Sequence, residues 1–138
     1  MYPEDLIAPM RAELTNAGFE EFRDAEEMKA AIQDKGTTLV VVNSVCGCAA
    51  GSCRPGLRMA LSSPGVKPTR AVTAFAGNDK SSVDMARGLM LPFPPSSPSI
   101  ALFKDGELVH MIERHHIEGR SAQALASNLT AAFEEFCS

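Results

Sequence analysis

The chain has 138 residues, of which 45% are hydrophobic and 22% are charged, as is typical of one ordinary globular domain. A formal net charge of −4 argues against a nucleic-acid groove and against a surface for anionic membranes. The first residues lack the basic and apolar regions of a signal peptide, and no apolar stretch is long enough to span a bilayer, so we expect a cytoplasmic protein.

Apolar residues at helical spacing and turn-forming residues divide the first half of the chain into elements. Pro3 suits the first turn of a helix, and Asp24 followed by Glu27 indicates the start of another. Thr37 to Asn43 is rich in β-branched residues and apolar on both faces, as expected for a central parallel strand covered on both sides. The predicted elements are a helix over 3–17 with Leu6, Ile7, Met10 and Leu14 inward, a strand over 19–23, a helix over 25–35 and a strand over 37–43.

The second half contains a strong hairpin signal. Asp105-Gly106 separates two apolar runs and supplies the positive φ angles of a type I′ turn. The predicted elements are a helix over 55–61, a strand over 70–76, a helix capped by Asn78 or Asp79 and running to 90, an irregular proline-rich segment over 91–98, strands over 99–104 and 107–112, a charged loop over 113–120 and a helix over 121–136. Alternating strands and helices followed by a hairpin favour an α/β fold, with a mixed central β-sheet flanked by helices on both faces.

Three of the four cysteines gather in one short segment that follows the predicted central strand. These are Cys46, Cys48 and Cys53, with Gly47 between the first two. Cytosolic thiols are kept reduced, so cysteines concentrated in this way indicate catalysis, redox sensing or metal binding rather than a structural disulfide. The segment is therefore the candidate functional site.

A thiolate, and not a thiol, attacks a disulfide, so the site must lower the pKa of one cysteine. The amino-terminal end of the following helix supplies partial positive charge, and Arg54 adds a full charge if its side chain folds back. We assign Cys46, the first cysteine of the motif, as the nucleophile and Cys48 as the resolving thiol. Cys53 is a candidate auxiliary thiol and is otherwise an inert helix residue.

A disulfide between two cysteines one residue apart closes a very small ring. Gly47 lets the backbone bend, but we still expect strain in such a bond. A strained disulfide is easily reduced, which suits an isomerase or a mixed-disulfide exchanger better than a strong reductant.

A second interpretation keeps the same cysteines but involves no turnover. Cys46, Cys48 and Cys53, with His115 or His116, provide four ligands of the kinds that zinc prefers. The spacing of Cys46 and Cys48 is shorter than in the usual zinc knuckle, so we prefer the redox interpretation and expect no metal. The two histidines lie in a charged run, where they are either solvated or bind the carboxylates of an anionic thiol.

The order of elements, with a cysteine motif after the central strand, resembles the thioredoxin fold. The run Ser97-Pro98-Ser99-Ile100-Ala101-Leu102-Phe103-Lys104-Asp105-Gly106 is similar to the segment around the cis-proline of thioredoxin. The resemblance implies that residues 1–138 form a single thioredoxin-like domain with an amino-terminal helical extension. It also implies that Pro98 is cis and faces the cysteine loop, and that Ser97 pairs with substrate backbone.

The closer resemblance is to the bacilliredoxin family, and it covers nearly the whole chain. It is carried by the run Asn43-Ser44-Val45-Cys46-Gly47-Cys48-Ala49-Ala50-Gly51, by Arg54-Pro55 and by residues near His115. The family is implied to remove bacillithiol, a small thiol, from mixed disulfides with proteins, and also to isomerise disulfides. Bacillithiol would be a substrate and not a bound cofactor, and the partners would be bacillithiol-capped or disulfide-containing proteins.

By this resemblance the surface that contacts the substrate would comprise Gly47, Arg54, Ser97 and Pro98. The chain departs from thioredoxin in its Cys-Gly-Cys motif and in having Val40 where thioredoxin has a buried aspartate. Cys53 stands where bacilliredoxins usually have a small residue such as alanine. A homodimer through residues 93–95 or through the first helix is compatible with the sequence.

Overall fold

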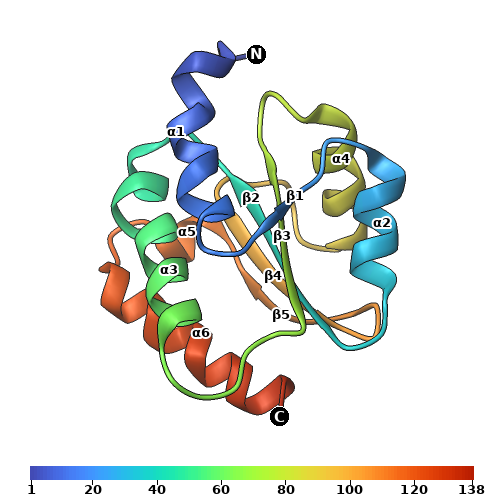
Figure 1. The fold of residues 1–138 in the computed structure, drawn as a ribbon, viewed down its shortest axis with the longest axis vertical. Coiled ribbons are helices and arrows are strands. Elements are labelled where there is room, and N and C mark those ends of the chain that lie inside the picture. Colours follow the sequence, from blue (N-terminus) through green and yellow to red (C-terminus); the bar gives the residue numbers. More distant parts are fainter.

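The computed structural model describes residues 1–138 and contains a mixed five-stranded sheet (Figure 1). The strands lie in the order β1-β3-β2-β4-β5, with β1, β3 and β2 parallel and with β4 and β5 antiparallel to their neighbours. Their bounds are β1 (Glu20–Glu21), β2 (Thr37–Asn43), β3 (Arg70–Phe75), β4 (Ser99–Lys104) and β5 (Glu107–Ile112). The helices are α1 (Glu4–Thr15), α2 (Ala25–Gln33), the π-helix η1 (Ala49–Cys53), α3 (Arg54–Ser62), α4 (Lys80–Leu89), α5 (Arg114–Ile117) and α6 (Ala122–Phe136). No helix is both long and apolar enough to cross a bilayer.

Helices cover both faces of the sheet, as predicted. In Figure 1, α1, α3 and α6 lie on the left of the sheet, and α2 and α4 lie on its right. All seven residues of β2 are buried because both faces are covered: Leu39 and Val41 pack with α3 and α6, while Val40 and Val42 pack with α2 and α4. The apolar pattern of this strand on both faces is thus explained.

The pairing of β2 with β4 determines what lies beside the cysteine loop. Val42 is the register partner of Ser99, so the residues after β2 and those before β4 meet at one edge of the sheet. The peptide bond between Ser97 and Pro98 is cis, which confirms that prediction. Pro98 is buried at this edge and Ser97 is half-buried.

Several local predictions are confirmed at the ends of elements. The Asp24 carboxylate accepts the Glu27 N–H at 3.1 Å, which caps α2. Asp105 and Gly106 have φ angles of 51° and 84°, as the type I′ hairpin turn requires. Helix α6 begins after Ser121, whose hydroxyl accepts the Ala124 N–H at 3.1 Å.

Other predictions are wrong in detail. The strand predicted over 19–23 shrinks to two residues, and the predicted loop over 113–120 contains α5. This short helix has a reciprocal cap: the Glu113 side chain accepts the His116 N–H, and the His116 Nδ1 accepts the Glu113 N–H at 3.1 Å. The helix predicted from residue 55 already begins at Ala49, as a π-helix that continues into α3.

Helix α1 buries an arginine that its apolar pattern did not predict. Ile7 and Leu14 are buried as expected, but Leu6 is 53% exposed and Arg11 is only 5% exposed. The Arg11 guanidinium donates to both oxygens of Asp79, at 2.7 and 2.8 Å, and also binds Glu4 and Glu21. The Asp79 side chain therefore does not cap α4; it accepts from Arg11 and from the Phe75 N–H at 2.9 Å.

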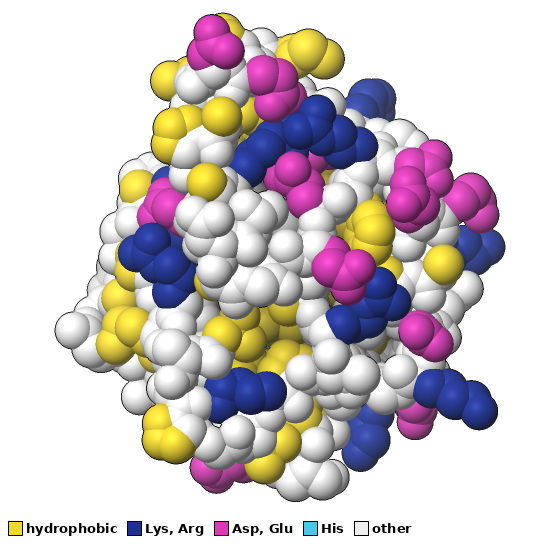
Figure 2. Space-filling model, viewed as in Figure 1, with side chains coloured by type: hydrophobic (Ala, Val, Ile, Leu, Met, Phe, Trp, Pro, Cys, Tyr) yellow, Lys and Arg dark blue, Asp and Glu magenta, His cyan; other side chains and the backbone are white.

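These contacts fasten α1 to β1 and to the start of α4. Figure 2 shows basic and acidic side chains side by side at this junction, below the amino-terminal end of the chain. Arg11 also lies over the ring of Phe75, with its guanidinium carbon 5.4 Å from the ring centroid.

Candidate active site

The cysteine pair lies in the loop that leaves the carboxyl end of β2. The sulfur atoms of Cys46 and Cys48 are 2.6 Å apart, and both residues are half-buried. Gly47 between them is exposed, and a side chain added there would meet no atom within 4 Å. The structure thus brings together the two thiols that the sequence assigned to nucleophile and resolving thiol, with open space around the residue that joins them.

Cys46 is the residue from which the following helix starts. Its carbonyl oxygen accepts the N–H groups of Ala49 at 3.0 Å and Ala50 at 3.3 Å, while its own N–H donates to the Ser44 hydroxyl at 3.2 Å. Partial burial raises the pKa of Cys46, but hydrogen bonds from Cys48, from the Ala49 N–H and from the Ser44 hydroxyl outweigh this effect and lower it below its usual value. The helix start and one serine therefore favour a thiolate at this position.

Cys48 has the opposite environment. Burial raises the pKa of its thiol to about 11, and the hydrogen bond to Cys46 and the negative charge of Cys46 add to the effect of burial. The positive charge of Arg114 works in the other direction, and the carboxylate of Glu118 raises the pKa further. The directions of the two pKa shifts thus favour a thiolate at Cys46 over a thiolate at Cys48.

The π-helix η1 follows the pair at once and orients the next residues. π-Helical turns are rare in proteins, and those that occur often lie at functional sites. Its wide turn is closed by the Arg54 N–H, which donates to the Ala49 carbonyl. The Ser52 hydroxyl donates to the carbonyl of Arg120, which holds η1 against the segment between α5 and α6.

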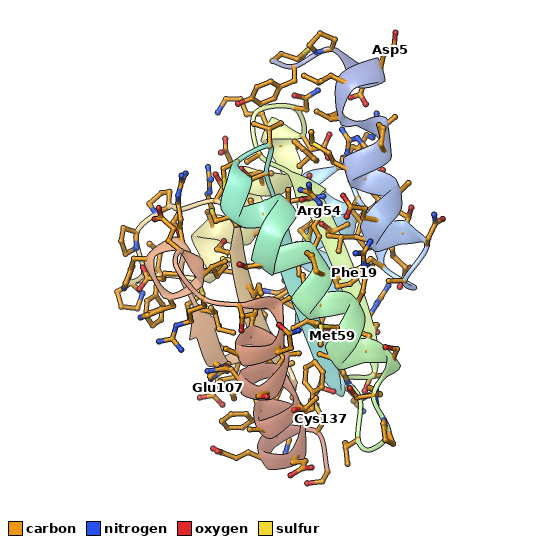
Figure 3. All side chains as sticks on the ribbon, turned by 90° about the vertical axis from the view of Figure 1, so that its left-hand side faces the viewer. Asp5, Phe19, Arg54, Met59, Glu107 and Cys137 are labelled. Carbon is orange, nitrogen blue, oxygen red and sulfur yellow. The ribbon has the colours of Figure 1, made fainter.

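Arg54 is buried beneath the loop. Its side chain is 2% exposed, and it donates to Glu13 at 2.8 Å, to the Asn43 side chain at 3.0 Å and to the Ser44 carbonyl at 2.7 Å. Figure 3 shows Arg54 at the start of α3, on the side that faces α1. The guanidinium thus joins α1, the end of β2 and α3, and it offers a substrate no exposed surface.

Arg114 forms hydrogen bonds with Ser96 and Ser97, the two residues that precede Pro98. Its Nη1 donates to the carbonyl oxygen of Ser97 at 3.2 Å, and its backbone N–H donates to the Ser96 hydroxyl at 3.4 Å. The positive charge of Arg114 also acts on the pKa of Cys48, which it lowers. Helix α5 therefore connects the cis-proline side of the site to the thiols.

Comparison with known proteins agrees with this geometry. The model of a family described as disulphide isomerase matches residues 2–137. A bacilliredoxin of Cytophaga hutchinsonii is 55% identical over 98% of this chain and 99% of its own length, and a bacilliredoxin of Koribacter versatilis is 51% identical over 99% and 94%.

The chain belongs to the bacilliredoxin family.

Solved structures show the fold of this bacilliredoxin independently. The oxidised mitochondrial thioredoxin 3 of Saccharomyces cerevisiae superposes with a TM-score of 0.58 at 18% identity, covering 89% of this chain and 98% of that chain. The thioredoxin of Malassezia sympodialis superposes with a TM-score of 0.60 at 14% identity, covering 88% and 92%. The fold is thus thioredoxin-like, and a bacilliredoxin with this fold is a thiol–disulfide oxidoreductase.

The Cys53 side chain is not exposed at the surface of this bacilliredoxin. Cys53 is the last residue of η1 and is fully buried in the core, and burial strongly raises the pKa of its thiol. Cys137 is half-buried at the end of α6. Neither thiol shares the open surface around Gly47.

The residues proposed for a zinc site are not assembled. The one group of three residues whose ligand atoms lie within 4.8 Å of one another is Glu113, His115 and His116, which contains no cysteine. Cys53, which the four-ligand interpretation needs, is enclosed by apolar side chains.

Sequence reasoning missed two residues that act on the pair. Ser44 belongs to the segment that carried the family resemblance, but nothing in its spacing indicated a contact with Cys46. The sequence predicts a charged loop around Arg114 and does not indicate its effect on the site, since Ser97 and Cys48 are far away in the sequence. The reciprocal cap of α5 uses a histidine where a glutamate or glutamine is usual, so the helix escaped prediction.

Proposed function

We propose that this bacilliredoxin removes bacillithiol from mixed disulfides with proteins, with Cys46 as the nucleophile and Cys48 as the resolving thiol. The observation that carries the proposal is the asymmetry of the pair: the two sulfurs lie 2.6 Å apart, the pKa of Cys46 is lowered and that of Cys48 is raised to about 11. One sulfur is thus prepared for attack, while the other holds a proton beside it.

In the first step the Cys46 thiolate attacks the bacillithiol sulfur of the mixed disulfide. A disulfide between Cys46 and bacillithiol forms, the original disulfide breaks, and the target protein leaves as a thiolate that takes a proton from water. No electrons are gained or lost in total, because one disulfide replaces another.

In the second step Cys48 loses its proton and attacks the sulfur of Cys46. Capping of Cys46 removes the negative charge and the hydrogen bond that raise the pKa of Cys48, so the resolving thiol becomes more acidic when it is needed. A Cys46–Cys48 disulfide forms, the bond between Cys46 and bacillithiol breaks, and bacillithiol leaves as a thiolate that takes up the proton that Cys48 lost. Two electrons from an external reducing thiol restore both cysteines.

The surface for the incoming chain is proposed at the edge where the loop meets the proline segment. Gly47 is exposed and leaves room for a close approach, and Pro98 and the half-buried Ser97 lie at the same edge. The buried Arg54 acts in this proposal by positioning the loop and not by touching substrate. Disulfide isomerisation uses the same attack by Cys46 on a protein disulfide, and the cytosol is the compartment in which the thiols stay reduced.

The test is turnover of a bacillithiol-capped protein by the wild type and by three single variants, followed by mass spectrometry. We expect Cys46→Ala to abolish transfer, Cys48→Ala to retain bacillithiol on Cys46, and Cys53→Ala to transfer the cap nearly as the wild type does. Transfer by Cys46→Ala, or a cap found on Cys48 in the wild type, would contradict the assignment.

A further inference from the structure

A small cleft lies between β5, α5 and the first turns of α6. Its volume is about 150 Å³, which is enough for a small organic group. Its lining combines apolar and polar side chains: Met111, Ile112 and Leu125 are apolar, while His110, His116, Arg120 and Asn128 are polar, and the His110 ring is hydrogen-bonded to the Asn128 amide oxygen at 2.9 Å.

This cleft lies beside the cysteine loop. The carbonyl of Arg120 accepts from the Ser52 hydroxyl of η1, the π-helix that begins directly after Cys48. Ile112 is the register partner of Ile100, so β5 ends at the same edge of the sheet at which β2 delivers the cysteines. The cleft and the thiols are thus neighbours across η1 and α5.

Arg120 is a free positive charge at this place. Its side chain is exposed and forms no ion pair, whereas six of the other arginines form at least one. The acidic groups nearby are already engaged: Glu118 pairs with Arg114 at 3.4 Å, and the Glu113 carboxylate accepts the His116 N–H. A cation beside apolar side chains and the side-chain amide of Asn128 matches a carboxylate on a short apolar stem.

We propose that the cleft binds the carboxylate-bearing small thiol of a mixed disulfide, and that Arg120 recognises its carboxylate. The inference rests on the proposed function and adds a specificity residue to it. When the cleft holds the small thiol of the mixed disulfide (the cap), the sulfur of the small thiol faces Cys46. The sulfur of the target protein is then the leaving group. The cleft thereby determines which sulfur of the mixed disulfide is attacked, and it discriminates against caps without a carboxylate.

The test compares two caps on one target protein. The cap is either bacillithiol, which carries carboxylates, or 2-mercaptoethanol, which carries none, and kcat/KM is measured for the wild type and for Arg120→Gln. We expect Arg120→Gln to lower kcat/KM for the carboxylate cap by about three- to tenfold, mainly through KM, and to leave the neutral cap unchanged. The substitution keeps the backbone carbonyl that Ser52 binds, so the fold is preserved.

Lys80→Gln is the matched control, since it removes one positive charge from the exposed start of α4, on the opposite face of the sheet. Lys80→Gln should leave kcat/KM unchanged for both caps. Arg120→Lys, which keeps the positive charge, should have a higher kcat/KM for the bacillithiol cap than Arg120→Gln. If Arg120→Gln slows both caps equally, or slows neither, the cleft is not a carboxylate site, although the proposed function stands. If the wild type releases neither cap, the proposed function fails and this inference fails with it.

Discussion

At the scale of single residues, the chemistry depends on which sulfur carries the charge. Cys46 and Cys48 are chemically identical and separated by one residue, and their hydrogen bonds, burial and neighbouring charges distinguish them. The sequence predicts that Cys46 acts first, since the first cysteine lies where the helix starts, and this order of action stays a prediction. It did not reveal Ser44, because a serine two residues before a cysteine has no spacing that predicts a hydrogen bond to it.

We expect Ser44→Ala to raise the pKa of Cys46, because the variant loses a hydroxyl that favours the thiolate. A hydrogen bond contributes about 0.5–1.5 kcal/mol, so alkylation of Cys46 at pH 7 should slow by about two- to tenfold. The rate of iodoacetamide labelling at Cys46 measures this effect. Ser62→Ala is the control, since the Ser62 hydroxyl donates only to the Met59 carbonyl in α3. Equal rates in wild type and Ser44→Ala would show that the serine has no such influence.

At the scale of elements, two buried arginines join helices to the sheet. Arg54 connects α3 with the end of β2, and Arg11 connects α1 with β1 and α4. An amphipathic pattern predicts where apolar side chains point, but not that an arginine on the same face will be buried. The partners of Arg11 include Asp79, 68 residues away, so only the folded chain brings the charges together.

We expect Arg11→Ala to lower the free energy of unfolding by about 3–5 kcal/mol, because Asp79 would remain buried without its partner. Urea unfolding monitored by circular dichroism measures the loss. Lys80→Ala is the control; it removes an exposed pair with Asp84 and should cost about 0.5 kcal/mol or less. A similarly small loss for Arg11→Ala would contradict the account of this junction.

The ion pair between Arg11 and Asp79 also makes the free energy of unfolding depend on pH. Burial raises the pKa of Asp79, but the hydrogen bonds from Arg11 outweigh burial and lower it below the value of an unfolded aspartate, about 3.8. The stabilisation is therefore fully present above that value and is lost as the pH falls through the lower pKa of the folded state. Unfolding in acid should show this loss in the wild type, and Arg11→Ala should not show it.

At the scale of the whole molecule, the thioredoxin-like architecture was predictable because its signals are local. The two apolar faces of β2, the Asp105-Gly106 turn and the capping residues each report on a few neighbouring residues. The π-helix η1 and the short helix α5 were not predictable in this way, because η1 has no characteristic sequence pattern and the cap of α5 uses a histidine in place of the usual glutamate or glutamine. The predictions of a single domain with a helical extension and of a homodimer stay predictions.

The central claim is that the negative charge of the pair lies on Cys46 and the proton on Cys48. The most direct test is alkylation of the reduced wild-type protein by iodoacetamide across pH 5–11, with each cysteine located by fragmentation of the labelled peptide. Among molecules that carry a single label, the label should lie on Cys46, with a midpoint below the ordinary thiol value of about 8.5, and a first label on Cys48 should appear only at much higher pH. Earlier labelling of Cys48, or one common midpoint for both cysteines, would contradict the mechanism derived from this structure.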